Sequence, residues 1–239
     1  MEKWKTKISG KRDGEFIIRG HRLADLIEKR SFVDVVFLLW RGSLPDETEA
    51  ALLNAMLVSA AEHGLEAPST FVARTVASTG NSFSSAIASG ILTIGDFHGG
   101  AIEQAAELFA SEKSAEYIVA DAREKKLRIP GYGHKVYKDG DPRTKVLFYR
   151  AEALGHAGRY VEKAKAIEAG LSSGGKKLPL NIDGALAALL LELGFDPHFA
   201  RPLFILARTA GLAAHAVEEV KNEKPYHRLA EEDTEYIGV

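Results

Sequence analysis

An all-α fold is the prediction from this sequence, and it depends on three observations. Leu52, Met56 and Ala60 recur at four-residue spacing, which places them on one face of a helix. Asp-Pro pairs at 141–142 and 196–197 each precede an apolar periodic run and are typical of an N-cap followed by a proline in the first helical turn. Convincing strands, with alternating apolar and polar residues, are nearly absent. We therefore expect helices packed on helices.

The remaining elements follow in chain order. A proline and two acids at 45–47 begin the first clear helix, and Gly64 is expected to end it. The stretch 82–90 is rich in Ser, Ala and Gly and predicts a helix that packs closely against others. Three glycines and two prolines interrupt the helical pattern over 128–143 and predict a loop. An exposed connection is expected over 172–177.

The domain organisation is expected to be uneven. A chain of 239 residues can form one large domain or two unequal ones. We expect a larger helical domain over 1–103 and 196–239, with a smaller helical domain over 104–195 inserted into it. Helical periodicity alone does not fix these boundaries.

Composition and charge exclude several classes of protein. With 46% hydrophobic and 27% charged residues, the chain is neither disordered nor fibrous. A net charge of −2 gives no sign of a nucleic-acid or anionic-membrane partner. Without cysteine there is no disulfide, thiolate metal site or cysteine nucleophile. No apolar signal-peptide core follows Met1 and no apolar run is long enough to span a bilayer, so we expect a cytoplasmic protein.

A histidine on a glycine-rich segment is the first candidate for chemistry. His98 is followed by Gly99 and Gly100, and small residues let a ligand approach the backbone and the ring closely. The alternative is a glycine turn that carries an incidental histidine. A second histidine, His134, lies on the loop beside Lys135 and Lys138, where positive charge disfavours the imidazolium form. The neighbouring cations could hold phosphates or carboxylates, or the loop could be a solvated basic segment.

An aspartate and an arginine complete the set of candidates. Asp183 is expected at or just before a helix N-terminus, where an apolar pocket and the helix dipole could tune it as a base; the alternative is an ordinary helix cap. Arg208 shares a helix face with Gly211 and His215 and needs an anionic partner, either a ligand or a structural acid. The sequence contains no P-loop, dinucleotide fingerprint or zinc signature.

Taken in order along the chain, six blocks resemble the citrate synthase superfamily, and together they cover nearly the whole sequence. Arg19–Pro45 resembles the family pattern "RGY…DL…LL-x-G-x-LP", and Glu62–Thr79 resembles "H…S-T-F-x-A-R-x-x-A-S". Gly95–Ala101 resembles "GPLHGGA", and Ile129–Arg143 resembles "PGYGH…DPR". Leu180–Gly184 resembles "N-x-D", and Ala207–Glu218 resembles "R-x-x-G-x-x-A-H-x-x-E".

The resemblance implies an all-helical fold with a large and a small domain, working as a homodimer with shared active sites or as a higher oligomer. It implies that His98 stabilises the enol of acetyl-CoA, that Asp183 moves the methyl proton, and that His134 binds the ketone of oxaloacetate. The dicarboxylate would be held by His63, Arg143 and Arg208, with Arg228 reaching across the dimer. CoA would contact Ile129, Gly131, Tyr132, Gly133, Lys135 and Lys138. We expect no metal and no cofactor, because the CoA thioester is itself substrate or product.

Within the family, the chain most resembles the citryl-CoA lyases, including the lyase domain of ATP-citrate lyase. It is shorter than an ordinary citrate synthase, and Gly184 follows Asp183 where synthases usually have aromatic residues. The stretch 88–96 also looks like the lyase domain. The resemblance therefore implies cleavage of citryl-CoA to acetyl-CoA and oxaloacetate. The alternatives are a short citrate or methylcitrate synthase, which hydrolyses the thioester, and a non-catalytic CoA-binding homologue.

Overall fold

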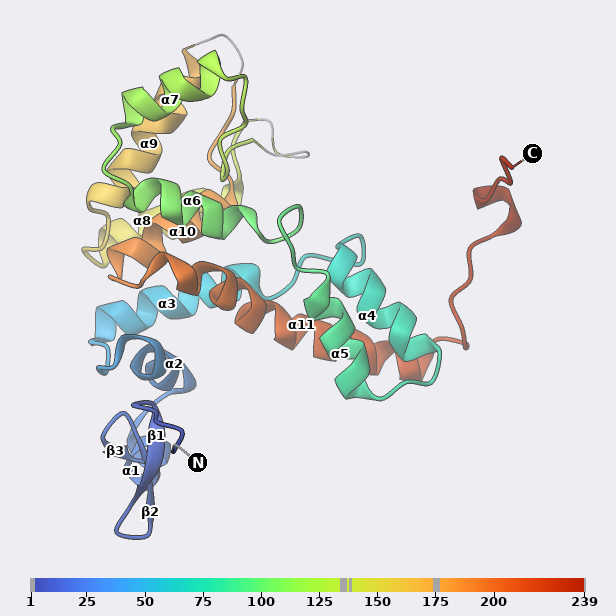
Figure 1. Ribbon diagram of the computed structural model, residues 1–239, viewed down its shortest axis with the longest axis horizontal. Coiled ribbons are helices and arrows are strands. Elements are labelled where there is room, and N and C mark those ends of the chain that lie inside the picture. The colour runs from blue at the N-terminus through green and yellow to red at the C-terminus, as the bar shows by residue number, and fades with distance from the viewer. Residues whose placement is uncertain (1–2, 134–136, 138, 174–176, 239) are drawn as a thin grey trace. The chain divides into compact units, whose positions relative to one another are not determined.

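The computed structural model describes residues 3–133, 137, 139–173 and 177–238 (Figure 1). Within these residues there are eleven α-helices and one small sheet, so the expected all-α class is confirmed. Both Asp-Pro pairs begin helical segments as predicted, with the aspartate side chain accepting a backbone N–H and the proline in the first turn. No helix of the described chain is both long and apolar enough to cross a membrane.

A short antiparallel ribbon at the N-terminal end was not expected from the sequence. It consists of β1 (Ser9–Arg12), β2 (Glu15–Ile18) and β3 (His21–Arg22), in that order. The turn between β1 and β2 is Asp13-Gly14, with φ of 53° and 83°. Positive φ at both central residues is what a two-residue type I′ hairpin turn requires, and Asp-Gly is a strong sequence signal for it.

Packing divides the chain into two compact units. The first consists of Met1–Ser59 and Ala101–Pro202, and the second of Ala60–Gly100 and Leu203–Val239. The division expected from the sequence, into a large domain over 1–103 and 196–239 and a small domain over 104–195, stays a prediction.

The first unit is organised around one helix that is apolar on every side. This helix is α10 (Ile182–Glu192), and all residues from Ala185 to Leu190 are fully buried. A helix without a polar face belongs in the interior of a packed domain. It is surrounded by α6, α8 and α9, and it contacts the short helix η1. The other elements of the unit are α1 (Leu23–Lys29), α2 (Phe32–Arg41), α3 (Glu47–Ala60), α6 (Ala101–Ala110), α7 (Ala115–Glu124), α8 (Pro142–Ala153), α9 (Arg159–Ser172) and η1 (Pro197–Phe199).

The helix expected to end at Gly64 ends earlier. Asp46 accepts the backbone N–H groups of Thr48 and Glu49, so α3 begins at Glu47 as the acids indicated. The helix stops at Ala60, and Gly64 instead occupies a later turn with φ of 82°. This difference matters because the residues between the helix end and Gly64 include His63, which lies on a turn rather than on a helix.

The second unit is built from three helices and their connections. α4 (Pro68–Ser78) and α5 (Phe83–Leu92) lie side by side as a helical hairpin (Figure 1). The third helix is α11 (Ala200–Asn222), and a short helix η2 (Glu231–Asp233) follows it. Ala77, Ala86 and Ala216 form a buried cluster. Within 82–90 only Ala86 and Gly90 are buried, and a Cβ atom at Gly90 would lie 2.8 Å from the Ser69 carbonyl oxygen. The predicted close packing therefore holds along one face of α5, while positions 82–85 and 88 are exposed.

Candidate active site

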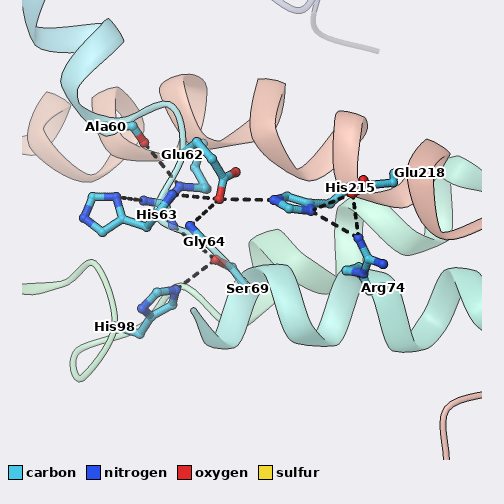
Figure 2. A network of polar contacts seen from close by, with 10 residues as sticks. Ala60, Glu62, His63, Gly64, Ser69, Arg74, His98, His215 and Glu218 are labelled. Carbon is cyan, nitrogen blue, oxygen red and sulfur yellow. Dashed lines mark hydrogen bonds and ion pairs between the residues drawn. The ribbon is translucent and has the colours of Figure 1, made fainter. Parts of the chain in front are cut away.

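The hydroxyl of Ser69 is the centre of a polar cluster in the second unit. Its Oγ lies 3.0 Å from Nε2 of His98 and 3.5 Å from Nη1 of Arg208 (Figure 2). Nη2 of Arg208 lies 2.8 Å from Nδ1 of His63. The structure thus brings together three of the residues that the sequence singled out, and it adds Ser69, which is fully buried at the start of α4.

A tight turn presents His98. The backbone N–H and C=O groups of Gly95 and His98 bond reciprocally, both at 2.9 Å. A Cβ atom at Gly99 would lie 2.8 Å from the Phe204 ring, and one at Gly100 would lie 2.5 Å from Cα of Asp96. The two glycines are therefore needed for the turn to pack on the protein itself. The glycine-turn interpretation is correct for the backbone, yet the histidine ring points at Ser69 (Figure 2).

The buried guanidinium of Arg208 fixes the protonation pattern of its neighbours. Its Nε donates to the carbonyl of Ala60 at 3.2 Å, and the group stacks 4.8 Å from the centre of the Phe204 ring. A guanidinium group has only donors, so Nδ1 of His63 must accept from it. His63 therefore carries its proton on Nε2 in this arrangement.

The Ser69 hydroxyl contacts both Arg208 and His98. Its oxygen accepts from Arg208, and its proton can be donated to Nε2 of His98, which would place the ring proton on Nδ1. Burial lowers the pKa of His98, and the positive charge of Arg208 lowers it further. The lowered pKa favours the neutral ring near pH 7. A neutral imidazole N–H of this kind can donate a hydrogen bond to a carbonyl oxygen on which negative charge develops.

We predict that His98 titrates below the ordinary histidine pKa of 6.5. The exposed His198 provides an internal control, because its hydrogen bond to Asp196 raises its pKa above that value. Histidine ring signals followed by NMR across pH 4–9 would measure both, with His98→Gln and His198→Gln identifying each resonance. A midpoint for His98 equal to or above that of His198 would contradict the assignment of a neutral ring.

Asp183 lies in the first unit, in the first turn of α10. The N-cap of this helix is Asn181, whose Oδ1 accepts the backbone N–H groups of Asp183 at 3.0 Å and of Gly184 at 3.2 Å. The capping interpretation of Asp183 is therefore wrong, since the residue two positions earlier makes the cap. The half-buried carboxylate of Asp183 instead stands at the positive end of a buried helix.

The glycine-rich loop is bound to the segment that carries Asp183. Gly133 N–H donates to the Pro179 carbonyl at 2.7 Å, and Asn181 N–H donates to the Gly131 carbonyl at 3.0 Å. Nδ2 of Asn181 donates to the Gly133 carbonyl at 2.9 Å. One side chain thus caps α10 and holds the residue that precedes His134. His134, Lys135 and Lys138 themselves lie outside the described residues.

Two side chains of the loop, one buried and one half-buried, pack or bond within the protein. The side chain of Ile129 is buried, and the Tyr132 hydroxyl donates to the Ala164 carbonyl at 2.9 Å. Burial raises the pKa of Tyr132 far above its ordinary value, so the phenol stays protonated as this donor. These contacts fix the path of the loop. The contact of the loop with CoA stays a prediction.

The two remaining arginines differ in how firmly they are held. Arg143 donates to the carboxylate of Asp141 through Nε at 3.0 Å and Nη2 at 2.7 Å. Asp141 is fully buried and also accepts the Ile182 N–H at 3.2 Å, so it ties Arg143 to the start of α10. Arg228 is exposed and follows His227, and its role stays a prediction.

Comparison with known proteins places this arrangement in a family. Residues 45–229 match the family described as citrate synthase, C-terminal domain. The chain belongs to the citrate synthase superfamily. Citrate synthase 2 of Bacillus subtilis (strain 168) is 34% identical to it over 204 residues, which are 82% of this chain and 53% of that protein. The chain spans about half the length of the curated citrate synthases it matches.

Solved structures of the superfamily include two with lyase names that the chain resembles over its length. The structure of citryl-CoA lyase from Hydrogenobacter thermophilus is 45% identical, with a TM-score of 0.94, covering 99% of this chain and 95% of that one. ATP citrate lyase from Methanothrix soehngenii, in complex with citrate and coenzyme A, is 25% identical with a TM-score of 0.89. It is matched over 100% of this chain and 42% of its own length.

Three residues of this superfamily member were not among the predicted site residues. Ser69 and Asn181 both lie inside the sequence blocks that resemble the family, but a serine near a helix start and an asparagine before a helix are common features of local structure. Asp141 was predicted only as a helix cap. Its pairing with Arg143 could have been predicted from the sequence, because the two residues lie on one turn and have opposite charge.

Proposed function

We propose that this chain is a citryl-CoA lyase, which cleaves citryl-CoA to acetyl-CoA and oxaloacetate. The observation that carries the proposal is the match to a citryl-CoA lyase structure at 45% identity and a TM-score of 0.94, whereas the citrate synthase of Bacillus subtilis is 34% identical. The protonation pattern around Ser69 supports it, since it leaves His98 as a neutral donor of the kind that an enolate oxygen needs.

The proposed reaction is a retro-aldol cleavage. His134 removes the proton of the tertiary hydroxyl, and the alkoxide becomes the ketone of oxaloacetate as the adjacent carbon–carbon bond breaks. The electron pair of that bond moves into the thioester as an enolate, whose oxygen accepts a hydrogen bond from Nδ1 of His98. Asp183, protonated at this stage, then delivers its proton to the carbon and completes acetyl-CoA. A donor at the oxygen and an acid at the carbon must act together, because the free enolate is too unstable at neutral pH.

The two carboxylates of the oxaloacetate half require cationic side chains whose hydrogen-bond donors are held in a fixed orientation. We propose that Arg143 and Arg208 supply them, with His63 beside Arg208. Planar guanidinium groups match carboxylates better than ammonium groups do, and both arginines are held by short hydrogen bonds before substrate arrives. The homodimer with shared sites, the position of Arg228 across it, and the cytoplasmic location stay predictions.

A citrate synthase is the second candidate. Curated citrate synthases that are 33–34% identical to the chain favour it. The bond-making step uses the same residues in reverse, and the two activities differ in whether the thioester is hydrolysed afterwards.

The test supplies purified protein with citryl-CoA in the presence of a thiol reagent. We expect acetyl-CoA and oxaloacetate to appear in equal amounts without free thiol, because a lyase leaves the thioester intact. Rapid release of free CoA would overturn the lyase proposal in favour of a synthase. Binding of citryl-CoA by calorimetry without any product would instead support a non-catalytic CoA-binding protein.

A further inference from the structure

The residue before His63 is bound by three donors. One oxygen of the Glu62 carboxylate, Oε1, accepts the backbone N–H of His63 at 2.8 Å and that of Gly64 at 2.6 Å. The same oxygen lies 3.2 Å from Nε2 of His215 (Figure 2). Two consecutive amides folded over one carboxylate oxygen define the conformation of the turn. The conformation of this turn orients the side chain of His63, whose ring contacts Arg208.

Helix α11 leaves space for the Glu62 carboxylate at Gly211. A Cβ atom at Gly211 would overlap Oε2 of Glu62 and would lie 2.5 Å from the Ala61 carbonyl oxygen. Arg208, Gly211 and His215 are spaced by three and four residues, so they share one face of α11. That single face provides the arginine that binds His63, the gap that admits Glu62, and the imidazole that contacts it.

The guanidinium group of Arg74 also contacts the imidazole of His215. Nδ1 of His215 lies 3.4 Å from Nη1 of Arg74 and 3.7 Å from Oε2 of Glu218. Arg74 is largely buried and is itself fixed by Glu218 at 2.9 Å and by the buried Glu219 at 2.7 Å. The guanidinium of Arg74 can donate to Nδ1 of His215, and Nε2 can then donate to Glu62. Arg74, His215 and Glu62 thus form a continuous series of polar contacts that ends at the two amides of the turn.

We propose that Glu62 is a positioning residue, which holds His63 and thereby Arg208 in the geometry that binds the dicarboxylate half of the substrate. Arg74 and His215 act by keeping Glu62 in the gap at Gly211. This inference rests on the proposed function for the identity of the substrate. It assigns Glu62 no contact with the reacting atoms, so loss of Glu62 acts on substrate binding more than on turnover.

The test compares two substitutions of Glu62 and one of Gly211. Glu62→Ala removes the acceptor, and we expect the KM for citryl-CoA to rise by about 10- to 100-fold with a much smaller change in kcat. Glu62→Gln keeps an acceptor oxygen for the two amides and is expected to restore most of the loss. Gly211→Ala fills the gap and should resemble Glu62→Ala. Glu66→Ala removes an exposed acid from the same loop and should leave both constants unchanged.

Oxaloacetate binding measured by calorimetry separates this inference from the proposed function. If wild-type protein binds oxaloacetate but does not cleave citryl-CoA, the lyase proposal fails and the Kd values of the variants still judge the role of Glu62. A Kd and a KM that are the same in Glu62→Ala and wild type would overturn the positioning role. An equal loss in Glu62→Gln and Glu62→Ala would also overturn it, because charge rather than the shape of the turn would then be responsible.

Discussion

Replacement of Asp183 by asparagine is expected to slow the turnover of citryl-CoA by about 10²- to 10⁴-fold, which is the usual contribution of a general acid or base. The amide has nearly the shape of the carboxylate but cannot deliver a proton to the enolate carbon. The cap of α10 is made by Asn181 and does not involve the Asp183 side chain, so the helix start should survive the change. Single-turnover kinetics with citryl-CoA would measure the effect, and thermal unfolding would confirm that the variant is folded.

Glu116→Gln is the matched control for this substitution. Glu116 occupies the same position in α7 as Asp183 does in α10, the second residue after the N-cap, and it is exposed. Both substitutions replace a carboxyl group by an amide in the first turn of a helix, so a general effect of that replacement on a helix start is common to both. We expect Glu116→Gln to have full activity. Near-normal turnover in Asp183→Asn would remove Asp183 from the reaction.

The parts of the fold that the sequence predicts are those that depend on neighbours along the chain. The two Asp-Pro helix starts are examples, because an N-cap needs only the amides of the next two or three residues. The helix start near Asp183 was predicted for a similar reason, and the structure adds that this helix is buried on every side. The Asp13-Gly14 hairpin was equally local. It was missed because its strands are short and their side chains largely exposed, so no apolar alternation marks them.

The parts that the sequence does not predict depend on partners that are distant along the chain. Whether Asn181 or Asp183 caps α10 cannot be decided from propensity, since both residue types favour that position. The choice follows from Gly133, which lies 48 residues away in sequence and accepts the Asn181 side-chain N–H. Ser69 likewise acquires its place in the site only when His98 and Arg208 reach it from other segments. The resemblance to the family supplied His98 and Asp183, but the contacts that orient them had to come from the structure.

Gly184→Ala is expected to destabilise the protein and to impair the proposed reaction at the same time. A Cβ atom at Gly184 would lie 2.6 Å from the Gly131 carbonyl oxygen and 2.5 Å from Cδ1 of Leu180. The leucine could move aside, but the carbonyl is backbone and accepts the Asn181 N–H. Overpacking of this kind costs about 1–3 kcal/mol of unfolding free energy. For a chain of this size that corresponds to a fall in Tm of roughly 2–12 °C.

Gly10→Ala is the control, because a Cβ atom there would have no neighbour within 4 Å. We expect its Tm to stay near that of the wild type, or to rise slightly through the reduced freedom of the unfolded chain. An alanine within a helix is intrinsically more favourable than glycine, so an unchanged or higher Tm in Gly184→Ala would show that the Gly131 loop moves away without cost. If the loop is instead pushed from α10, the variant should lose activity even well below its Tm, because the segment that leads to His134 would no longer be held beside Asp183. Activity measured at a temperature where both proteins are fully folded distinguishes these outcomes.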